Sequence, residues 1–454
     1  MATQRRFQPL PAGTHGLDPQ DVRIDQARRL REAMIELIAA KGFPAVRIAD
    51  LARLAHVSPP TLYSLYADKE QLFIGTYEDV ARRASAAILT GRTEHHDRAL
   101  RLRDAMRAFA SLAGREPAAV SLLVLGAFGA GPAVLRKRRA ALDALEAYIH
   151  AHRAPGVPFD DRDLTVRAVL GGIREVTATR LREGRQAELP GLAATLSAWT
   201  GCYPAQLPQG LAAPAHRPAG AGPAGEAVGP SPRAKRAGGR LPSGRSDLPR
   251  EAIVKSQQER IVDATAAIVA EQGLAALTIP AIAKRANVSN QTFYSFYPSK
   301  HDAFLGAQKV GMHQALRVTG EAYGAHPGDW PSAVTAGIGA LLGYLASEPA
   351  HAHLAIVDTF AASPEAIAIR QDAIDAFRSY LSPGFKRGAE ASGGDVPGEL
   401  AAEAVVGGIW QILHDYVAGG AADALPGVAP QLSYFALVPF IGAREAAAAA
   451  RNAG

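Results

Sequence analysis

Cysteine, aromatic side chains and long apolar runs are all scarce in this chain of 454 residues. The single cysteine, Cys202, excludes an intrachain disulfide and a cysteine-based zinc site, and it suits a reducing cytosol. Aromatic residues make up only 6% of the chain and alanine is abundant, which favours helices over sheets. The most apolar run, Ser121 to Leu135, contains a proline and falls short of the about 20 residues that span a bilayer. We therefore expect a helical protein with no membrane partner.

The rest of the composition is that of a globular protein. Hydrophobic residues account for 48% of the chain and charged residues for 20%, and the length is enough for about two to four domains. The net charge of +6 permits an anionic partner without requiring one. The first residues lack the apolar segment of a secretion signal, so we expect a cytoplasmic location.

A stretch near the N-terminus recurs later in the chain. The sequence VSPPTLYSLYADKEQLF (Val57–Phe73) returns 231 positions later as VSNQTFYSFYPSKHDAF (Val288–Phe304). Between Arg29 and Phe73, 16 of 45 positions are identical at this offset, without a gap. A repeat this regular indicates a duplicated structural unit.

The duplication extends far beyond this stretch. Leu122–Ile149 resembles Leu354–Leu381 at an offset of 232, and Val169–Ile173 matches Val405–Ile409 at an offset of 236. The unit of about 180 residues is therefore used twice; we call residues 25–203 copy one and residues 255–445 copy two. The stretch between them is rich in Pro, Gly and Ala and predicts a disordered linker. Its basic residues either keep it solvated or contact an anionic polymer.

Each copy begins with the pattern of a helix-turn-helix. A first helix ends at Gly42 or Gly273 as its C-cap, and a second short helix follows over 48–54 or 279–285. A tight turn comes next, at which a positive φ is expected for His56 and Asn287, both residue types that tolerate it. Serine then caps a third helix in both copies.

The third helix has two distinct faces. Its core face is predicted to consist of Leu62, Leu65 and Tyr66 in copy one, and of Phe293, Phe296 and Tyr297 in copy two. The opposite face carries small polar groups and a tyrosine, which suit base edges and phosphates in a DNA major groove. The alternative for Tyr63 and Tyr294 is packing against a neighbouring helix, and packing is the preferred interpretation for Tyr66 and Tyr297.

A lysine recurs at the start of a fourth helix. Lys69 and Lys300 each follow a plausible N-cap, Asp68 or Ser299, so their charge opposes the helix dipole. A DNA phosphate at that helix N-terminus would offset this cost. The alternative is an exposed lysine without a role, which the recurrence in both copies disfavours.

These elements resemble the TetR family of bacterial transcriptional regulators. Copy two reads GLAALTIPAIAKRANVSNQTFYSFYPSKHDAF and copy one reads GFPAVRIADLARLAHVSPPTLYSLYADKEQLF. The resemblance covers both copies, although only the first sixty or so positions of each carry the motif. It implies an all-α fold in which each helix-turn-helix domain is followed by a helical module that dimerises and commonly holds a small-molecule pocket. Copy one departs from the family pattern at Arg47, where Thr is usual, and at His56, where Gly is usual.

The resemblance leads to a predicted organisation and a predicted DNA-binding surface. The segments, in order, are a disordered tail (1–24), helix-turn-helix domain one (25–80), helical C-terminal module one (81–203), a disordered basic linker (204–254), helix-turn-helix domain two (255–311), helical C-terminal module two (312–445) and a tail (446–454). The predicted DNA-binding residues are Arg47, Ser58, Pro59, Pro60, Thr61, Tyr63, Ser64 and Lys69 in copy one, and Thr278, Ser289, Asn290, Gln291, Thr292, Tyr294, Ser295 and Lys300 in copy two.

The C-terminal modules carry weaker signals. Gly-Gly pairs occur at 171–172 and 407–408 within apolar helical segments, although glycine lowers helix stability. A close approach of two helices would explain them, and the resemblance implies that the subunits pair through such helices. Trp410 and Tyr416 are candidates for a ligand pocket, with core packing as the alternative.

Metal and cofactor sites are not expected. The residues His351, His353, Asp358 and His414 suggest a metal site, but His351 and His353 lie on different helix faces, so no metal is predicted. No phosphate-binding glycine loop, nucleophile elbow or spaced catalytic carboxylates are present, so we predict no enzyme and no cofactor.

The sequence thus predicts a transcriptional regulator that binds double-stranded operator DNA and responds, as a repressor, to a small-molecule effector. It would be associated with the nucleoid when bound to DNA. The alternative is a protein-interaction or ligand-sensing helical protein with a degenerate DNA-binding face. Salt-dependent binding to duplex DNA separates the two.

Two arrangements of the copies remain open. They can pair within one chain as a pseudo-dimer, since a linker of about 46 residues spans roughly 35–40 Å, or two chains can pair like with like as a homodimer. The recognition faces differ, with amide side chains at Asn290 and Gln291 and only apolar contacts at Pro59 and Pro60. A pseudo-dimer therefore predicts an asymmetric operator.

Overall fold

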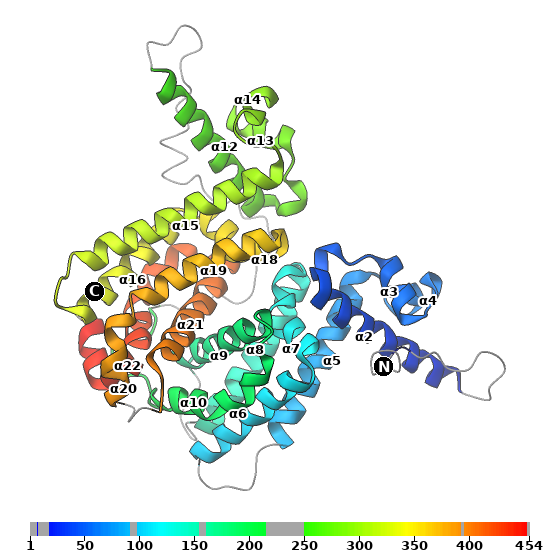
Figure 1. Ribbon diagram of the computed structural model, residues 1–454, viewed down its shortest axis with the longest axis horizontal. Coiled ribbons are helices and arrows are strands. Elements are labelled where there is room, and N and C mark those ends of the chain that lie inside the picture. The colour runs from blue at the N-terminus through cyan, green and yellow to red at the C-terminus, as the bar shows by residue number, and fades with distance from the viewer. Residues whose placement is uncertain are drawn as a thin grey trace. The chain divides into compact units, whose positions relative to one another are not determined.

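The computed structural model describes residues 7, 18–90, 98–153, 160–214, 249–391 and 395–451, and every regular element within these ranges is a helix (Figure 1). The predicted all-α fold is thereby confirmed. Most of the predicted linker, residues 215–248, and most of the predicted N-terminal tail, residues 1–6 and 8–17, lie outside the described residues, so the disorder expected there stays a prediction.

The helices of copy one follow the order expected from the sequence. They are α2 (Pro19–Ala45), α3 (Ile48–Ala55), α4 (Pro59–Leu65), α5 (Lys69–Thr90), α6 (Arg98–Arg115), α7 (Pro117–Val124), η1 (Gly126–Gly129), α8 (Pro132–Arg153), α9 (Thr165–Arg182), η2 (Gln186–Glu188) and α10 (Leu189–Gly201).

The helices of copy two repeat this order with additional short turns. They are α12 (Arg250–Gln272), η3 (Leu274–Ala276), α13 (Ile279–Ala286), α14 (Asn290–Tyr294), α15 (Lys300–Gly324), α16 (Trp330–Ser347), α17 (Pro349–His353), η4 (Leu354–Asp358), α18 (Thr359–Ala362), α19 (Pro364–Ser379), η5 (Ser382–Gly384), α20 (Phe385–Ala391), α21 (Gly398–Ala418), η6 (Ala422–Val428) and α22 (Ala429–Arg451).

Three segments that were expected to lack structure are ordered in part. Helix α2 already begins at Pro19, capped by the Asp18 carboxylate, which accepts a hydrogen bond from the Gln20 amide at 2.8 Å. Helix α12 begins at Arg250, and α22 continues to Arg451. The predicted tails and linker were therefore too long at these ends, because the repeated motifs that set the bounds do not reach the helix ends.

Each helix-turn-helix domain has a core of its own. In copy one the buried cluster includes Leu30, Leu51, Leu62 and Phe73, together with residues of α7. In copy two the equivalent cluster includes Ile261, Ile282, Phe293 and Phe304, together with residues of α17 and η4. Because residues of the C-terminal module belong to the same cluster, each helix-turn-helix domain packs against its own module.

The chain forms two compact units that do not coincide with the two copies. The first comprises Met1–Leu145 and Arg174–Ser197, and the second comprises Glu146–Ile173 and Ala198–Gly454. Copy two lies entirely in the second unit. That unit also takes in the first half of α9 and the end of α10 from copy one.

Within this second unit, α9 and α21 approach each other closely at glycines. A β-carbon at Gly172 would lie 2.5 Å from the carbonyl oxygen of Ala404, and one at Gly408 would lie 2.5 Å from the carbonyl oxygen of Ala168. The repeat offset of 236 converts the first of these contacts into the second. The contact is therefore reciprocal, as in an isologous interface. The close approach expected at both Gly-Gly pairs is confirmed.

Aromatic residues extend this contact along α10 and α22. Trp199 and Phe435, which occupy the same position of the repeat, meet each other with ring centroids 6.2 Å apart. The Tyr203 hydroxyl donates to the Phe435 carbonyl oxygen at 3.1 Å, and the Tyr203 and Phe435 rings stack at 4.8 Å. The second unit thus joins the ends of both C-terminal modules in one core.

Among the described residues, one helical stretch is apolar and long enough to cross a membrane, Ala422–Arg451. Two thirds (67%) of its apolar window is buried inside the protein, as is usual for a core helix.

Candidate nucleic-acid interface

The tight turn between the second and third helices has the geometry predicted from its sequence. His56 and Asn287 both have φ of 51°, and they are the only non-glycine residues with positive φ in the described ranges. Each ends its helix in the left-handed conformation, α3 in copy one and α13 in copy two. The turn aims the third helix, α4 or α14, away from the second, and we call α4 and α14 the recognition helices.

A serine caps each recognition helix through the same hydrogen bonds. The Thr61 amide donates to Ser58 Oγ at 3.2 Å, and the Thr292 amide donates to Ser289 Oγ at 3.0 Å. The threonine hydroxyls lie 2.8 Å and 2.9 Å from the same serine oxygens. Both predicted N-caps are confirmed, and the start of each recognition helix is held before any ligand binds.

The two faces of the recognition helices separate as predicted. Leu62 and Phe293 are fully buried, whereas Tyr63 and Tyr294 are 55% and 57% exposed. The residues at the exposed tip differ between the copies: they are Pro59 and Pro60 in copy one, and Asn290 and Gln291 in copy two. Ser64 and Ser295 are also exposed, and each hydroxyl donates to the carbonyl oxygen of the threonine three positions earlier.

Tyr66 and Tyr297, on the core side of the recognition helices, pack inward, as was preferred for them from the sequence. Tyr297 is 8% exposed, and its ring lies so close to Gly306 of α15 that a β-carbon there would be 2.6 Å away. Tyr66 lies against Gly75 at the same position of α5, and its hydroxyl accepts from Arg31 at 3.1 Å. A glycine on the fourth helix thus makes room for a tyrosine in both copies.

The recurring lysines bind backbone carbonyls within the protein, a contact that the sequence did not indicate. Lys69 Nζ donates to the carbonyl oxygens of Phe43 and Val46, both at 3.1 Å, and lies 4.2 Å from the centre of the Phe43 ring. Lys300 Nζ donates to the Leu277 carbonyl oxygen at 2.9 Å. Burial lowers the pKa of Lys69. An ammonium group has three donors, so both lysines keep at least one for a phosphate.

An arginine that sequence reasoning missed braces the turn. Arg29 Nη1 donates to the carbonyl oxygens of Ala55 and His56 at 2.5 Å and 3.0 Å. Arg260 does the same in copy two, reaching Ala286 and Asn287 at 2.8 Å and 3.1 Å. These are the last carbonyls of α3 and α13, which have no partner inside the helix. The identity of Arg29 and Arg260 within the repeat was the available signal.

The start of the second helix differs between the copies. Thr278 accepts a hydrogen bond from the Ala281 amide at 3.3 Å and so caps α13, as predicted. Arg47 makes no such bond at the start of α3, also as predicted, and its side chain is exposed. Copy one therefore places a cation where copy two places a neutral cap.

Copy two also contains an apolar cavity of about 110 Å³ among α15, α16, α19 and α21. Leu341, Phe377 and Trp410 line it, and its few polar neighbours include Arg370 and His351. The Arg370 guanidinium lies 4.3 Å from the centre of the Trp410 ring. Of the two ligand candidates from the sequence, Trp410 lines this cavity, whereas Tyr416 is buried and is not part of the lining.

The cavity wall connects to the first helix of helix-turn-helix domain two. His351 of α17 lines the cavity, and its Nε2 lies 3.5 Å from the Asp263 carboxylate on α12. Nearby, His353 Nδ1 lies 2.7 Å from the Asp358 carboxylate. Burial raises the pKa of Asp358. Burial by itself would lower the pKa of His353, but the adjacent Asp358 carboxylate outweighs it, so the pKa of His353 is raised. No cluster of three metal-binding side chains occurs among the described residues.

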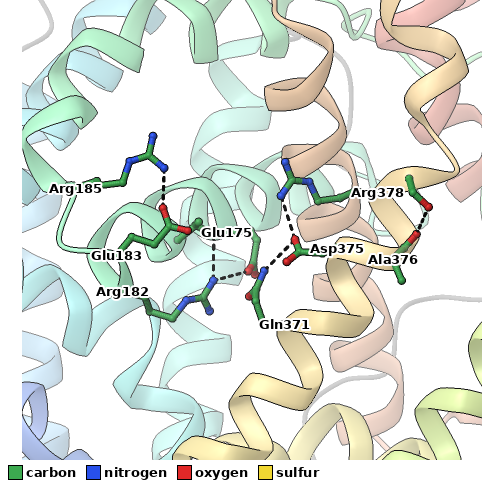
Figure 2. Close-up of polar contacts among 10 residues, drawn as sticks. Glu175, Arg182, Glu183, Arg185, Gln371, Asp375, Ala376 and Arg378 are labelled. Carbon is green, nitrogen blue, oxygen red and sulfur yellow. Dashed lines mark hydrogen bonds and ion pairs between the residues drawn. The ribbon is translucent and has the colours of Figure 1, made fainter.

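The position of Trp410 is occupied in copy one by a charged residue. The repeat aligns Trp410 with Arg174, which pairs with Glu175 at 2.6 Å. Glu175 is fully buried and also binds Arg182 at 3.2 Å, as Figure 2 shows. Elsewhere in Figure 2, Asp375 on α19 binds the partly exposed side chains of Arg378 and Gln371. Copy one thus has an ion-pair network where copy two has an aromatic wall.

Two helix-turn-helix domains with capped recognition helices, each followed by an all-helical module, define a duplicated protein of the helix-turn-helix class. The sequence profile described as "Bacterial regulatory proteins, tetR family" matches residues 30–76 and 261–306. Both segments therefore belong to the N-terminal domain of this TetR family, and the chain carries two tandem copies of that domain.

Three proteins similar to this chain are named as regulators. A Mycobacterium tuberculosis protein named as a mycofactocin biosynthesis transcriptional regulator is 33% identical over 95 residues. The match covers 20% of this chain and 46% of that relative, so it spans about half of the relative's length. Among solved structures, a fatty acid degradation regulator from Bacillus halodurans has 16% identity and a TM-score of 0.35, covering 38% of this chain and 94% of the other. A TetR-like transcriptional regulator from Rhodococcus has 21% identity and a TM-score of 0.34, covering 41% and 98%.

Proposed function

We propose that this chain is a sequence-specific regulator of transcription that binds double-stranded DNA through both recognition helices. The observation that carries this proposal is the duplicated framework: cap, left-handed turn, buried hydrophobic residue and exposed tyrosine recur in both copies. A rigid helix with small polar groups and an exposed tyrosine offers contacts to phosphates and base edges. The remaining N–H groups of Lys69 and Lys300 would bind phosphate at the start of the fourth helix.

The test of DNA binding is its dependence on salt. The logarithm of the binding constant for duplex DNA should fall linearly with the logarithm of salt concentration, with a slope set by the number of phosphate contacts. Tyr63→Ala and Tyr294→Ala should each weaken binding while leaving the thermal unfolding unchanged, because both rings are exposed. Salt-independent or absent binding to a pool of random duplexes would favour a protein-interaction role instead.

We further propose that the two copies act as an intramolecular pseudo-dimer. The reciprocal contacts of Gly172 with Ala404 and of Gly408 with Ala168 support this arrangement. A linker of this length with the flexibility that its composition predicts would hold one module at about millimolar effective concentration near the other, which favours pairing within the chain. Light scattering at micromolar concentration tests the arrangement, and a particle of twice the 47.6 kDa chain mass would reject it.

As a regulator, the protein would respond to a small apolar effector bound in the cavity of copy two, and the effector would release DNA so that the protein acts as a repressor. The cavity has about 110 Å³ and an apolar lining, comparable to engineered cavities of about 150 Å³ that bind benzene. The His351–Asp263 pair gives a physical route from the cavity wall to the DNA-binding domain. Movement of α17 on effector binding would shift α12 and with it the recognition helix.

Small aromatic probes test this sensing role. Benzene or toluene should raise the melting temperature of the chain and lower its affinity for DNA. Ala373→Phe would fill the cavity and should abolish the thermal shift while DNA binding persists. Loss of probe binding in this variant, together with an unchanged effect of the probe on DNA affinity, would show that the probe acts elsewhere.

A further inference from the structure

The face through which α9 and α21 meet is symmetric in shape but not in charge. The glycine contacts are reciprocal, and Trp199 meets its own repeat equivalent, Phe435. Across the same face, Arg167 Nη1 of α9 lies 3.5 Å from Asp415 Oδ2 of α21. The repeat offset of 236 maps this pair onto Glu403 and Thr179. Copy two therefore has glutamate at the repeat position of Arg167, and copy one has threonine at the repeat position of Asp415.

The Arg167–Asp415 pair is buried and held from both sides. Arg167 is fully buried, and its Nε and Nη2 donate to Glu146 Oε2 at 3.0 Å and 2.7 Å. Asp415 is 3% exposed and accepts from Gln411 Nε2 at 2.8 Å. A buried charge tolerates the loss of its opposite charge poorly, because it cannot recover its hydration. The charges of Arg167 and Asp415 therefore strongly affect which copy can pair across this face.

We propose that these charges select copy one as the partner of copy two and reject pairing of a copy with its own kind. The proposal rests on the pseudo-dimer proposed above. In a pair made of two copies two, each Asp415 would face a Glu403, which brings two carboxylates together twice in a buried face. In a pair made of two copies one, each Arg167 would face a Thr179 and lose its carboxylate across the face.

This device works by penalising the wrong pair rather than by strengthening the right one. A buried ion pair contributes little net stability compared with apolar residues, whereas like charges placed opposite each other are strongly unfavourable. Discrimination is a difference between affinities, and a clash in the rejected pair is sufficient to produce it. The linker raises the rate of pairing within a chain, but the charges make the choice of partner independent of the linker.

Cutting the chain between the copies tests the selection directly. A protease site inserted within residues 215–248 would be cleaved in the full-length protein, so that every residue remains present but the copies are held only by their interface. After equilibration in mild denaturant and its removal, native mass spectrometry separates the three possible pairs by mass. We expect the mixed pair to exceed each like pair by on the order of a hundredfold. A random mixture of the three pairs would overturn the proposal.

A variant that equalises the charges provides the contrast. Arg167→Glu combined with Asp415→Thr gives both copies the same residues at these two positions, and the cut protein should move towards the random mixture. Arg378→Gln is the matched control, because Arg378 is the repeat equivalent of Glu146 but pairs with Asp375 on the surface. This control should leave the mixed pair dominant. A random mixture in the control as well would contradict a role specific to Arg167 and Asp415.

A second measurement on the uncut chain keeps the proposal testable if the equalised variant does not fold. Arg167→Gln, Asp415→Asn and their combination form a double-mutant cycle read out by urea unfolding. We expect the double variant to have a much smaller unfolding equilibrium constant than the two single effects, multiplied together, predict. Effects that multiply to within about twofold would overturn the proposal, because the two charges would then act independently.

The outcomes distinguish this proposal from the pseudo-dimer itself. If the uncut chain forms a two-chain particle but the cut halves still pair as copy one with copy two, the intramolecular arrangement fails and the charge selection stands. If the uncut chain is a single-chain particle whose cut halves mix at random, the pseudo-dimer stands and the charge selection fails.

Discussion

Copy one and copy two hold their recognition helices with the same side chains but present different ones at the surface. The serine cap, the arginine brace and the lysine on the fourth helix all recur at the repeat offset. The tip residues do not: prolines stand in copy one where Asn290 and Gln291 stand in copy two. The copies thus share the side chains that hold the recognition helix and differ in those that it presents at its exposed tip.

The C-terminal modules differ in a second way. Copy two has a cavity with Trp410 in its wall and His351 linking that wall to α12. Copy one has Arg174 and Ala119 at the same positions of the repeat. A charged network and a methyl group cannot reproduce an apolar wall with a histidine link, so the proposed effector site lies in copy two.

The largest effect is expected at the glycines that the two modules share. Gly172→Leu should lower the free energy of unfolding by about 3 kcal/mol or more, because the new side chain would overlap Ala404 and Trp199. Gly408→Leu should cost about the same, since its contacts are the repeat equivalents. The measurement is urea unfolding of the whole chain. Gly343→Ala in α16 is the control: nothing lies near this glycine, so the free energy of unfolding should rise by about 0.5–1 kcal/mol.

A difference between the two recognition tips should appear in DNA affinity. Gln291→Ala should cost about 1–3 kcal/mol on the operator half bound by copy two and relax the preference at one or two base pairs. Pro60→Ala should cost less, because a proline makes only apolar contacts there. Selection of sites from random duplexes checks both variants. A perfect palindrome selected by the unaltered single chain would contradict the predicted asymmetric operator.

The lysines should behave alike on DNA but differently in stability. Lys69→Met and Lys300→Met should weaken binding to all sequences equally and flatten the salt slope by about one each. Lys69→Met should also destabilise its domain more, because Lys69 binds two carbonyls and Lys300 binds one. Salt titrations on several duplexes and thermal unfolding measure the two effects. A changed sequence preference would disprove the role of phosphate contact.

The smallest effect concerns pH and should arise only in copy two. The pKa of His353 is raised above its usual 6.5 by Asp358, and copy one has Ser121 and Gly126 at these positions. A histidine with a raised folded-state pKa contributes stability that is complete below the unfolded-state pKa and is lost as pH rises through the folded one. Stability should therefore decrease slightly as the pH rises above the usual histidine pKa of about 6.5 and through the raised pKa of His353. His353→Gln should remove this change, and an unaltered pH profile in that variant would reject the assignment.

Much of the helix-turn-helix geometry was accessible from the sequence. The left-handed turns at His56 and Asn287, the serine caps and the burial of Leu62 and Phe293 all follow from rules that act within a few residues. Such rules need no knowledge of distant segments. The contacts that brace these elements could not be predicted from the sequence. Arg29 and Lys69 donate to carbonyl oxygens more than twenty positions away, and their local sequence does not indicate those acceptors.

By itself, the sequence determined that the chain is a tandem duplication of an all-α unit with a helix-turn-helix at the start of each copy. Repetition and helical periodicity are properties of the one-dimensional pattern. Only the tertiary structure decided that the second compact unit draws helix segments from both copies, that one copy holds an apolar cavity, and that Arg167 faces Asp415 across the α9–α21 contact. These features depend on which surfaces are buried together. The energetic effect of a buried charge or cavity depends on the groups packed around it, and those groups come from distant parts of the chain.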